Sequence, residues 1–370
     1  MDQAINKLFE KFNAHGKLPS PRGVALQVIQ LTEQNDTTAQ QIAKLVNNDP
    51  SLASRILKSA NLLVRREGRP VTSIIDAVTV LGLKSVRQLA LSLSLVSDFG
   101  SGSCAGFDYQ KFWAHSVCCG ISAQQLVKKM NIGVADEAFL LGLLSQIGRL
   151  TLTTVFPEQY SKILAQVDIS RNLSDLEQDT FGLEHNQIAS LMLADWGMPK
   201  LFQDISLYIE HPEKSGFTEE SRNWRLLQLF HFADSLATLC ISDPAERFHN
   251  VPRLMLLATR VGIETDTLIE IGNLVIQGLG EWSALLNIAA PKLPPFEELL
   301  NTASIAHELI GMDGLPGTTP PAFKAASRRP RPCAWRGRPS SAGGRYRWPA
   351  GAASPEARGR RCWPCSSAPG

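Results

Sequence analysis

Apolar residues in the first 312 positions recur with the spacing of α-helices, and no alternating pattern typical of β-strands persists there. In the segment TTAQQIAKLVNNDP, Ile42, Leu45 and Val46 follow the i, i+3, i+4 rule behind a capping threonine, Thr37 or Thr38. Such a pattern gives each helix one apolar face, which has to be buried against another element. The sequence therefore predicts an all-α fold.

Start and stop signals divide this region into separate helices. Asp49 followed by Pro50 supplies a cap and a first-turn proline. Ser73 and Asp76 resemble a capping box, and Gly82 stands where a C-terminal glycine belongs. We expect further helices over residues 112–130, 137–156, 185–196, 201–209 and 224–239, capping boxes at Ser174/Glu177 and Thr267/Glu270, and a last helix from Pro295.

The link GSGSCAGFDY, residues 100–109, is rich in Gly and Ser and predicts a boundary between two helical subdomains. We place an N-terminal helical subdomain at 1–100 and a second helical subdomain at 101–245. A helical extension follows at 246–312, and an Arg/Pro/Gly-rich tail at 313–370.

The tail differs from the rest in composition, because it has almost no aliphatic residue larger than Ala. Such a segment cannot offset the entropy of ordering, so we expect disorder. An Arg-rich arm for nucleic acid is one interpretation. The composition fits better with translation out of frame after about Gly314, with a further domain in the natural protein. A sensible continuation in another frame of the gene would support this hypothesis.

Charge and cysteine usage bear on where such a chain works. Of 37 Lys and Arg, eleven lie from Asp313 onward, as do two of 35 acidic residues, so residues 1–312 carry a net charge of −7. An acidic body disfavours nucleic acid and anionic membranes as partners. The N-terminus has no apolar signal core, and seven cysteines fit reduced thiols better than a disulfide framework. We expect a cytoplasmic protein.

The stretch LLSQIGRL, residues 143–150, resembles an active-site turn with its working side chains exchanged. With His and Asp at Ser145 and Gln146, and Lys at Arg149, it would read LLHDIGKL, the signature of the HD phosphohydrolases. A hydroxyl and a carboxamide cannot replace imidazole and carboxylate at a divalent metal. The arginine keeps the positive charge and can pair with a carboxylate or phosphate. The exchange predicts that no metal or other cofactor is held here.

Other candidate site residues surround this turn in the sequence. His115 shares a helix face with Phe112, and Asp234 lies one helical turn beyond Phe230. Isolated helical histidines are more often hydrogen-bonded core residues than ligands. A leftover metal site is the alternative, formed by His115, His185, His211 and Asp234.

The helix-Gly-helix at residues 73–94, SIIDAVTVLGLKSVRQLALSLS, has the spacing of a helix-turn-helix. Lys84, Arg87 and Gln88 could face DNA from its second helix. Because the acidic body supplies little phosphate-binding charge, a packed helical corner is the favoured interpretation.

Several ordered motifs resemble the HDOD (HD-related output domain) family: LPSPRGVALQVIQL, IAKLVNNDPSLASRILKSAN, RPVTSIIDAVTVLGLKSVRQLALSLSL, FWAHS, GLLSQIGRL, EHNQIASLMLADWGMP and IEHPE. They extend over about residues 17–240. The resemblance implies an N-terminal helical bundle packed on an HD-like bundle. It also implies similarity to the HD-GYP cyclic di-GMP phosphodiesterases without their metal ligands.

The resemblance assigns a former role to each candidate residue. His115 matches the first histidine of the HD ligand pattern, His185 and His211 match later histidines, and Asp234 matches the final aspartate. Ser145, Gln146 and Arg149 lie in the turn at residues 143–150, which we call the exchanged turn because other side chains replace the His, Asp and Lys of the HD signature. No GYP motif follows His211, where the sequence is PEKSGFTEE.

The function implied is a non-catalytic signal-transduction scaffold of bacteria. It would act by binding a protein partner or a small ligand at a vestigial pocket, rather than as an enzyme. Two alternatives stay open, a residual metal-dependent phosphohydrolase and a DNA-binding regulator that uses residues 73–94.

Overall fold

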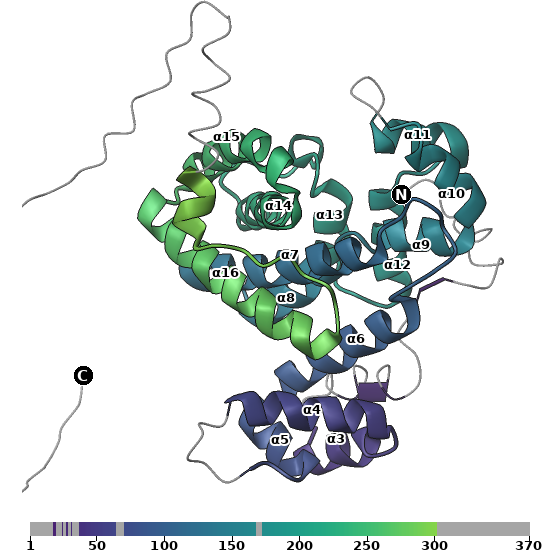
Figure 1. The fold of residues 1–370 in the computed structure, drawn as a ribbon, viewed down its shortest axis with the longest axis vertical. Helices are drawn as coiled ribbons and strands as arrows, with labels where there is room; N and C mark the ends of the chain where they lie inside the picture. The colour runs from purple at the N-terminus through teal and green to yellow at the C-terminus, as the bar shows by residue number, and fades with distance from the viewer. Residues whose placement is uncertain are drawn as a thin grey trace, which may run out of the picture. The chain divides into compact units, whose positions relative to one another are not determined.

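The computed structural model of the chain describes residues 37–63, 70–167 and 172–301, together with Leu18, Pro19, Val24, Gln27, Val28 and Leu31. All regular secondary structure in these residues is helical (Figure 1). The prediction of an all-α fold is therefore confirmed. The tail from residue 313 lies outside the described residues, so its predicted disorder and reading frame stay predictions, as do the subdomain boundaries.

The first described helices are α3 (Ala39–Val46), α4 (Pro50–Leu63), α5 (Ile74–Leu81) and α6 (Leu83–Phe99). The first three begin where the sequence predicts a cap, whereas α6 follows Gly82 without a side-chain cap. Thr38 forms a capping box with Gln41 at the start of α3. Asp49 accepts the backbone N–H of Leu52 at 3.0 Å before α4, and Ser73 caps α5. These short polar side chains satisfy N–H groups that a helix start leaves without partners.

The helix-Gly-helix is a packed corner. Gly82 joins α5 to α6 at φ +82°, a conformation that disfavours other residues. Gln88, which we considered as a residue facing DNA, is buried, and its side-chain amide donates to the backbone oxygen of Asp136 at 2.6 Å. Of the proposed contact residues, Lys84 is exposed. The geometry favours the corner over a DNA-reading helix.

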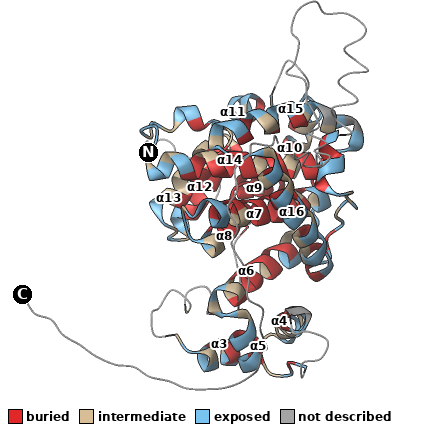
Figure 2. Cartoon of the chain, turned by 90° about the vertical axis from the view of Figure 1, so that its left-hand side faces the viewer, coloured by how far each residue is buried: buried red, intermediate tan, exposed pale blue. Residues whose placement is uncertain are grey.

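The remaining helices are α7 (Tyr109–Met130), α8 (Ala135–Leu144), α9 (Ile147–Val155), α10 (Pro157–Leu164), α11 (Leu173–Phe181), α12 (His185–Asp195), α13 (Lys200–Tyr208), η1 (Pro212–Lys214), α14 (Arg222–Ile241), α15 (Pro244–Val261) and α16 (Thr265–Leu286). Helix α7 packs against α8, α14 and α16, which makes it the centre of this part of the core. The most heavily buried ribbon in Figure 2 includes α7, α9 and α14.

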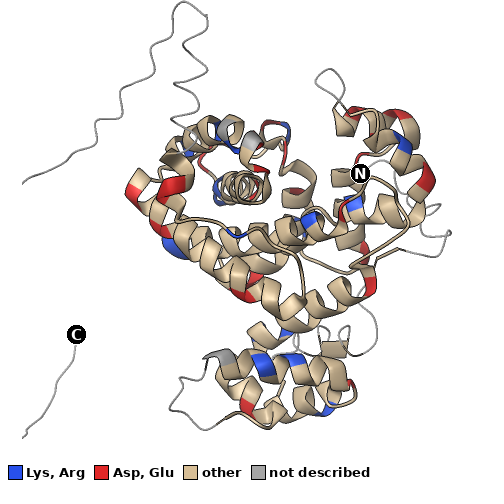
Figure 3. Cartoon of the chain, viewed as in Figure 1, with Lys and Arg blue, Asp and Glu red and all other residues tan. Residues whose placement is uncertain are grey.

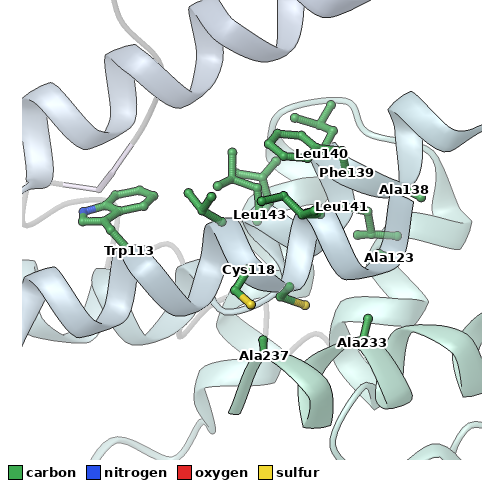
Figure 4. Packing of buried hydrophobic residues seen from close by; sticks show 14 of the residues in the cluster. Trp113, Cys118, Ala123, Ala138, Phe139, Leu140, Leu141, Leu143, Ala233 and Ala237 are labelled. Carbon is green, nitrogen blue, oxygen red and sulfur yellow. The ribbon is translucent and has the colours of Figure 1, made fainter. Parts of the chain in front are cut away.

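Small residues let the central helices approach closely. Figure 4 shows Trp113, Cys118 and Ala123 beside Phe139, Leu140, Leu141 and Leu143 of α8, with Ala233 and Ala237 of α14 nearby. A Cβ at Gly120 would lie 2.8 Å from the carbonyl oxygen of Phe139, and one at Gly142 would lie 2.8 Å from that of Cys119. The α7–α8 contact therefore requires glycine on both sides.

The predicted helix over residues 137–156 is broken at the exchanged turn. Helix α8 ends at Leu144, and Gln146 leaves helical geometry at φ −106°, ψ 19° before α9 begins. The Ser145 hydroxyl donates to the carbonyl oxygen of Gly142 at 2.9 Å, a local bond that competes with the helix ladder. A Cβ at Gly148 would overlap the carbonyl oxygen of His185, so glycine allows α9 to pack directly on α12.

Two predicted capping boxes are wrong. Helix α11 is capped two residues earlier than expected, by Asn172, whose side chain accepts the N–H of Asp175 at 2.8 Å. Ser174 therefore lies inside the helix. Helix α16 is likewise preceded by Glu264, so that Thr267 lies within its first turn. Residues 296–301 are helical, close to the start expected at Pro295. The other predicted helices differ from the observed ones by a few residues at their ends.

Among the described residues, the stretch Ala135–Val155 is long and apolar enough to cross a membrane by length and composition. It spans the broken pair α8 and α9, and 83% of its apolar window is buried inside the protein. Its apolar side chains are therefore covered by other helices of the same chain.

Candidate functional site

Four of the seven predicted site residues lie around one cavity of about 430 Å³: His115, Gln146, Arg149 and Asp234. They come from α7, from the turn between α8 and α9, from α9 itself and from α14. Glu210 lies on the same wall although sequence reasoning did not select it. A volume of this size is within the range of pockets for small molecules.

His115 is held by a hydroxyl of α14. Its Nε2 lies 3.1 Å from Oγ1 of Thr238 and 3.7 Å from Oδ1 of Asp234. Because the Thr238 hydroxyl donates its one hydrogen to the Asp234 backbone oxygen at 2.9 Å, it accepts from His115, which fixes the Nε2–H tautomer. Burial lowers the pKa of His115, and Asp234 opposes this in part. The imidazole is thus neutral at neutral pH.

The side chain of Gln146 links Asp234 to Arg149 by hydrogen bonds. Its side-chain nitrogen donates to Oδ1 of Asp234 at 3.0 Å, and its side-chain oxygen accepts from Nη1 of Arg149 at 3.2 Å. A neutral amide can donate to a carboxylate and accept from a guanidinium at the same time, whereas an ionised aspartate at this position could only accept. Burial raises the pKa of Asp234, and His115 acts in the opposite direction.

Ser145 does not belong to the cavity wall. Its side chain is 1% exposed, and its hydroxyl lies 4.0 Å from Sγ of Cys119 in addition to its bond to Gly142. The hydroxyl therefore points into the packing between α7 and α8. Of the exchanged pair, only the carboxamide faces the cavity.

His185 is enclosed between two carboxylates. Its Nδ1 lies 2.6 Å from Oε2 of Glu177, and its Nε2 lies 3.0 Å from Oε1 of Glu210. Tyr160 donates to the second oxygen of Glu177 at 2.7 Å. His185 and Glu177 are buried, and Glu177 also accepts the backbone N–H of His185 at 2.8 Å. This carboxyl therefore belongs to an internal polar cluster and not to the predicted capping box with Ser174. We call His185, Glu177, Glu210 and Tyr160 the His185 cluster.

The two carboxylates reverse the effect of burial on His185. Burial lowers the pKa of the imidazole, but Glu210 and Glu177 together raise it to about 10. Burial also raises the pKa of Glu210, whereas His185 lowers it to about 2. The histidine is therefore an imidazolium at neutral pH, with both ring nitrogens engaged as donors. Such a ring has no lone pair for a metal.

His211 lies apart from the cavity. Its side chain is 48% exposed, and its Nδ1 lies 3.2 Å from Oε1 of Glu213, within two residues in the chain. The preceding residue, Glu210, faces inward instead. The resemblance therefore pointed to the right place in the chain, but the residue that lines the cavity there is Glu210 and not His211.

The residues present do not fit a metal centre of the HD type. Among the described residues, no group of three or more His, Cys, Asp and Glu side chains is arranged to hold a metal ion. At the exchanged turn the Gln146 amide nitrogen is directed at Asp234, and Glu210 is already neutralised by His185. This leaves His115 and Asp234, and two donors are fewer than the structural or catalytic zinc sites of proteins use.

The HDOD domain family matches residues 18–212. The chain belongs to the HDOD family. Helix α14, which supplies Asp234 and Thr238, lies beyond the matched residues, so the cavity is completed by a segment outside the HDOD match.

One solved structure supports the assignment to this fold, and two further similar proteins share sequence with the chain. An HDOD domain protein from Geobacter sulfurreducens is 19% identical and superposes with a TM-score of 0.56, covering 75% of this chain and 98% of that one. The MmoQ response regulator from Methylococcus capsulatus str. Bath is 33% identical over 69% of this chain and 97% of its own, with a TM-score of 0.44. A protein from Treponema pallidum (strain Nichols) is 22% identical over 186 residues, and the match spans 50% of this chain but 36% of that protein.

Proposed function

We propose that this HDOD protein is a non-catalytic signalling module of the cytoplasm whose cavity binds a small ligand and whose helical surface binds a protein partner. Membership of the HDOD family and a relative named as a response regulator fit a role in signalling. The structure supplies a cavity of suitable size at the position of the former HD turn.

One observation carries the proposal, the double hydrogen bond of the Gln146 side chain. The amide engages Asp234 on one side and Arg149 on the other, and it lies where the resemblance places a metal-binding carboxylate. A hydrolase of this kind needs a metal ion to activate water. An amide that is hydrogen-bonded to a carboxylate and to a guanidinium can instead help to recognise polar groups of a ligand.

The cavity wall offers two kinds of surface. Phe107 and Phe112, with ring centroids 5.5 Å apart, form an apolar portion next to His115. Arg149 and Asp234 provide opposite charges. A small molecule with a flat apolar part and polar edges would be complementary to this lining.

Ligand binding here can change how helices pack. The wall is formed by side chains of α7, α9 and α14, and α7 and α14 are direct neighbours in the core. A ligand shifts an equilibrium between two arrangements only if it binds one of them better. We propose that the occupied cavity favours one packing of α7 against α14, which a partner protein then recognises.

The test is a hydrolysis assay on the full chain with cyclic di-GMP and with bis(p-nitrophenyl) phosphate, in the presence of Mn²⁺, Fe²⁺ or Mg²⁺. We expect no product above the metal-only control. An active HD phosphohydrolase run in parallel shows that the assay works. Turnover by this protein that disappears in His115→Ala would overturn the proposal and support a residual hydrolase.

A further inference from the structure

A second cavity, of about 410 Å³, lies where three helices end. Its lining comes from the C-terminal end of α7, the N-terminal end of α14 and the C-terminal end of α15. Its lining residues include Met130, Arg222, Trp224, Arg225 and Arg260. None of them lines the cavity that contains His115, and the rise of an α-helix separates Met130 from His115 by about 22 Å along α7.

The charge of this second cavity is unusual for the chain. Arg222, Arg225 and Arg260 line it, and no acidic residue is among the described residues of its wall. Elsewhere Lys and Arg are interspersed with Asp and Glu over the ribbon (Figure 3). In the described part of the chain, no carboxylate lies within salt-bridge distance of any of the three guanidinium groups. Three full positive charges therefore converge without a counterion from this part of the protein.

Local structure positions these arginines. Ser221 caps α14 and accepts the N–H of Trp224 at 3.1 Å, which places Trp224 and Arg225 in the first turn. The Nε of Arg222 donates to the carbonyl oxygen of Ile132 at 3.3 Å, so that side chain is held toward the end of α7. Helix ends carry about half an elementary charge each. The C-terminal ends of α7 and α15 and the N-terminal end of α14 together contribute about minus one half of an elementary charge. The three guanidinium groups carry a larger charge of opposite sign.

Apart from Asn131 and Gln228, the rest of the wall is apolar and aromatic. Trp224 is half-buried, and Met130, Ile132 and Leu229 add aliphatic surface. A guanidinium binds carboxylate or phosphate oxygens through paired, charge-assisted hydrogen bonds. An indole face accepts flat rings. The two features together define a ligand with an oxyanion at one end and a ring at the other.

We propose that this second cavity is a binding site for a small aromatic oxyanion, with Arg222, Arg225 and Arg260 holding the phosphate or carboxylate group and Trp224 contacting the ring. The site is separate from the cavity of the proposed function, because Arg225 and Arg260 do not line the latter. It shares α7 and α14 with that cavity, on opposite stretches of both helices.

The test is isothermal titration calorimetry of the full chain with phenyl phosphate, and with benzoate, phenol and inorganic phosphate as comparison probes. We expect one-to-one binding of phenyl phosphate or benzoate with a dissociation constant on the order of 1 mM or lower. The relative affinities of phenyl phosphate and benzoate identify which oxyanion the arginines prefer. Phenol lacks the charge and inorganic phosphate lacks the ring, so both should bind at least about tenfold more weakly.

Substitutions locate the binding site. Arg225→Ala and Arg260→Ala should each weaken phenyl phosphate binding about tenfold or more. Arg253→Ala is the matched control, because Arg253 is an exposed arginine of α15 that lines neither cavity. All three positions are exposed, so the variants should melt like the unaltered protein, as circular dichroism can verify.

Three results would overturn the proposal. The first is no saturable heat with phenyl phosphate or benzoate up to about 10 mM. The second is binding that Arg225→Ala and Arg260→Ala leave unchanged, which would place the ligand elsewhere. The third is phenol or inorganic phosphate binding as tightly as phenyl phosphate, which would remove the role of the arginines or of the ring.

Discussion

His115 and His185 occupy comparable positions in the resemblance to HD enzymes, yet their surroundings are opposite. His115 faces an open cavity, with a hydroxyl partner at 3.1 Å and a carboxylate at 3.7 Å, and burial lowers its pKa. His185 is enclosed by two carboxylates at 2.6 and 3.0 Å, which raise its pKa to about 10. The first is a neutral group available to a ligand, and the second is a cation that holds helices together.

The two histidines belong to two different regions, a cavity wall and a buried charged cluster. Glu177 lies on α11, Glu210 follows α13, and His185 begins α12, so the buried charges connect three helices beside the cavity. Glu210 belongs to both regions, because it lines the cavity and pairs with His185. The His185 cluster therefore supports the wall without contributing a metal donor.

The largest expected effect comes from breaking the His185 cluster. His185→Ala leaves the Glu177 carboxylate buried without a cationic partner, held only by Tyr160 and the backbone N–H of residue 185. Removing one member of a buried ion pair costs about 3–5 kcal/mol. His115→Ala loses one hydrogen bond to Thr238, worth about 1 kcal/mol. Urea unfolding followed by circular dichroism measures both. Equal losses of stability in the two variants would contradict the division of roles.

The two histidines should also respond oppositely to pH. The stability supplied by His185 is fully present below its unfolded pKa, near 6.5, and is lost as pH rises through about 10. His115 has a lowered pKa, so its neutral form supplies stability above 6.5 that is lost as pH falls. Between pH 7 and 9, unfolding experiments should show a decline on the order of 1 kcal/mol per pH unit. The decline should be absent in His185→Gln.

Glu210 makes the free energy of unfolding depend on pH in the acid range as well. Its pKa is lowered to about 2, so its contribution is present above 4.5 and is lost as pH falls toward 2. NMR titration of the histidine ring protons separates these effects site by site. A His185 ring that titrates near pH 6.5 would show that the cluster is not charged as described.

A smaller effect is expected from restoring one metal donor. Gln146→Asp places a carboxylate near His115 and Asp234, and it should raise Mn²⁺ affinity about tenfold or more over the unaltered protein. Gln146→Asn, which keeps the amide, is the matched control. Ser145→His should add no affinity, because position 145 faces Cys119 instead of the cavity. Mn²⁺ affinity is measured by calorimetry, and equal affinities in the Asp and Asn variants would refute the role given to Gln146.

Much of the fold was predictable because caps and apolar spacing are local properties of the sequence. Asp49, Ser73 and Gly82 act as predicted, and the order of motifs brought His115, Gln146, Arg149 and Asp234 to one cavity. The errors at Ser174 and Thr267 arose because each helix begins a few residues earlier, directly after Asn172 and Glu264, and the spacing of a capping box does not by itself fix which polar residue precedes the helix.

The His185 cluster could not be predicted in the same way. Glu177 and Glu210 pair with His185 across 8 and 25 positions, and such pairing depends on how α11, α12 and α13 pack. The choice between Glu210 and His211 depends on the course of the chain after α13 ends, where helical periodicity no longer applies. The sequence signal for the cluster was the carboxyl of Glu177 next to the apolar Leu176 in a helix. The same carboxyl also fits a capping box with Ser174, so it did not identify a buried charge.

The central claim is that the exchanged turn removes the metal site while the cavity persists. Titration of the full chain with Mn²⁺ near pH 7.5, with and without His115→Ala, tests this most directly. The account predicts no stoichiometric binding tighter than about 1 mM, and no difference between the two proteins. One-to-one binding in the micromolar range that His115→Ala abolishes would contradict it.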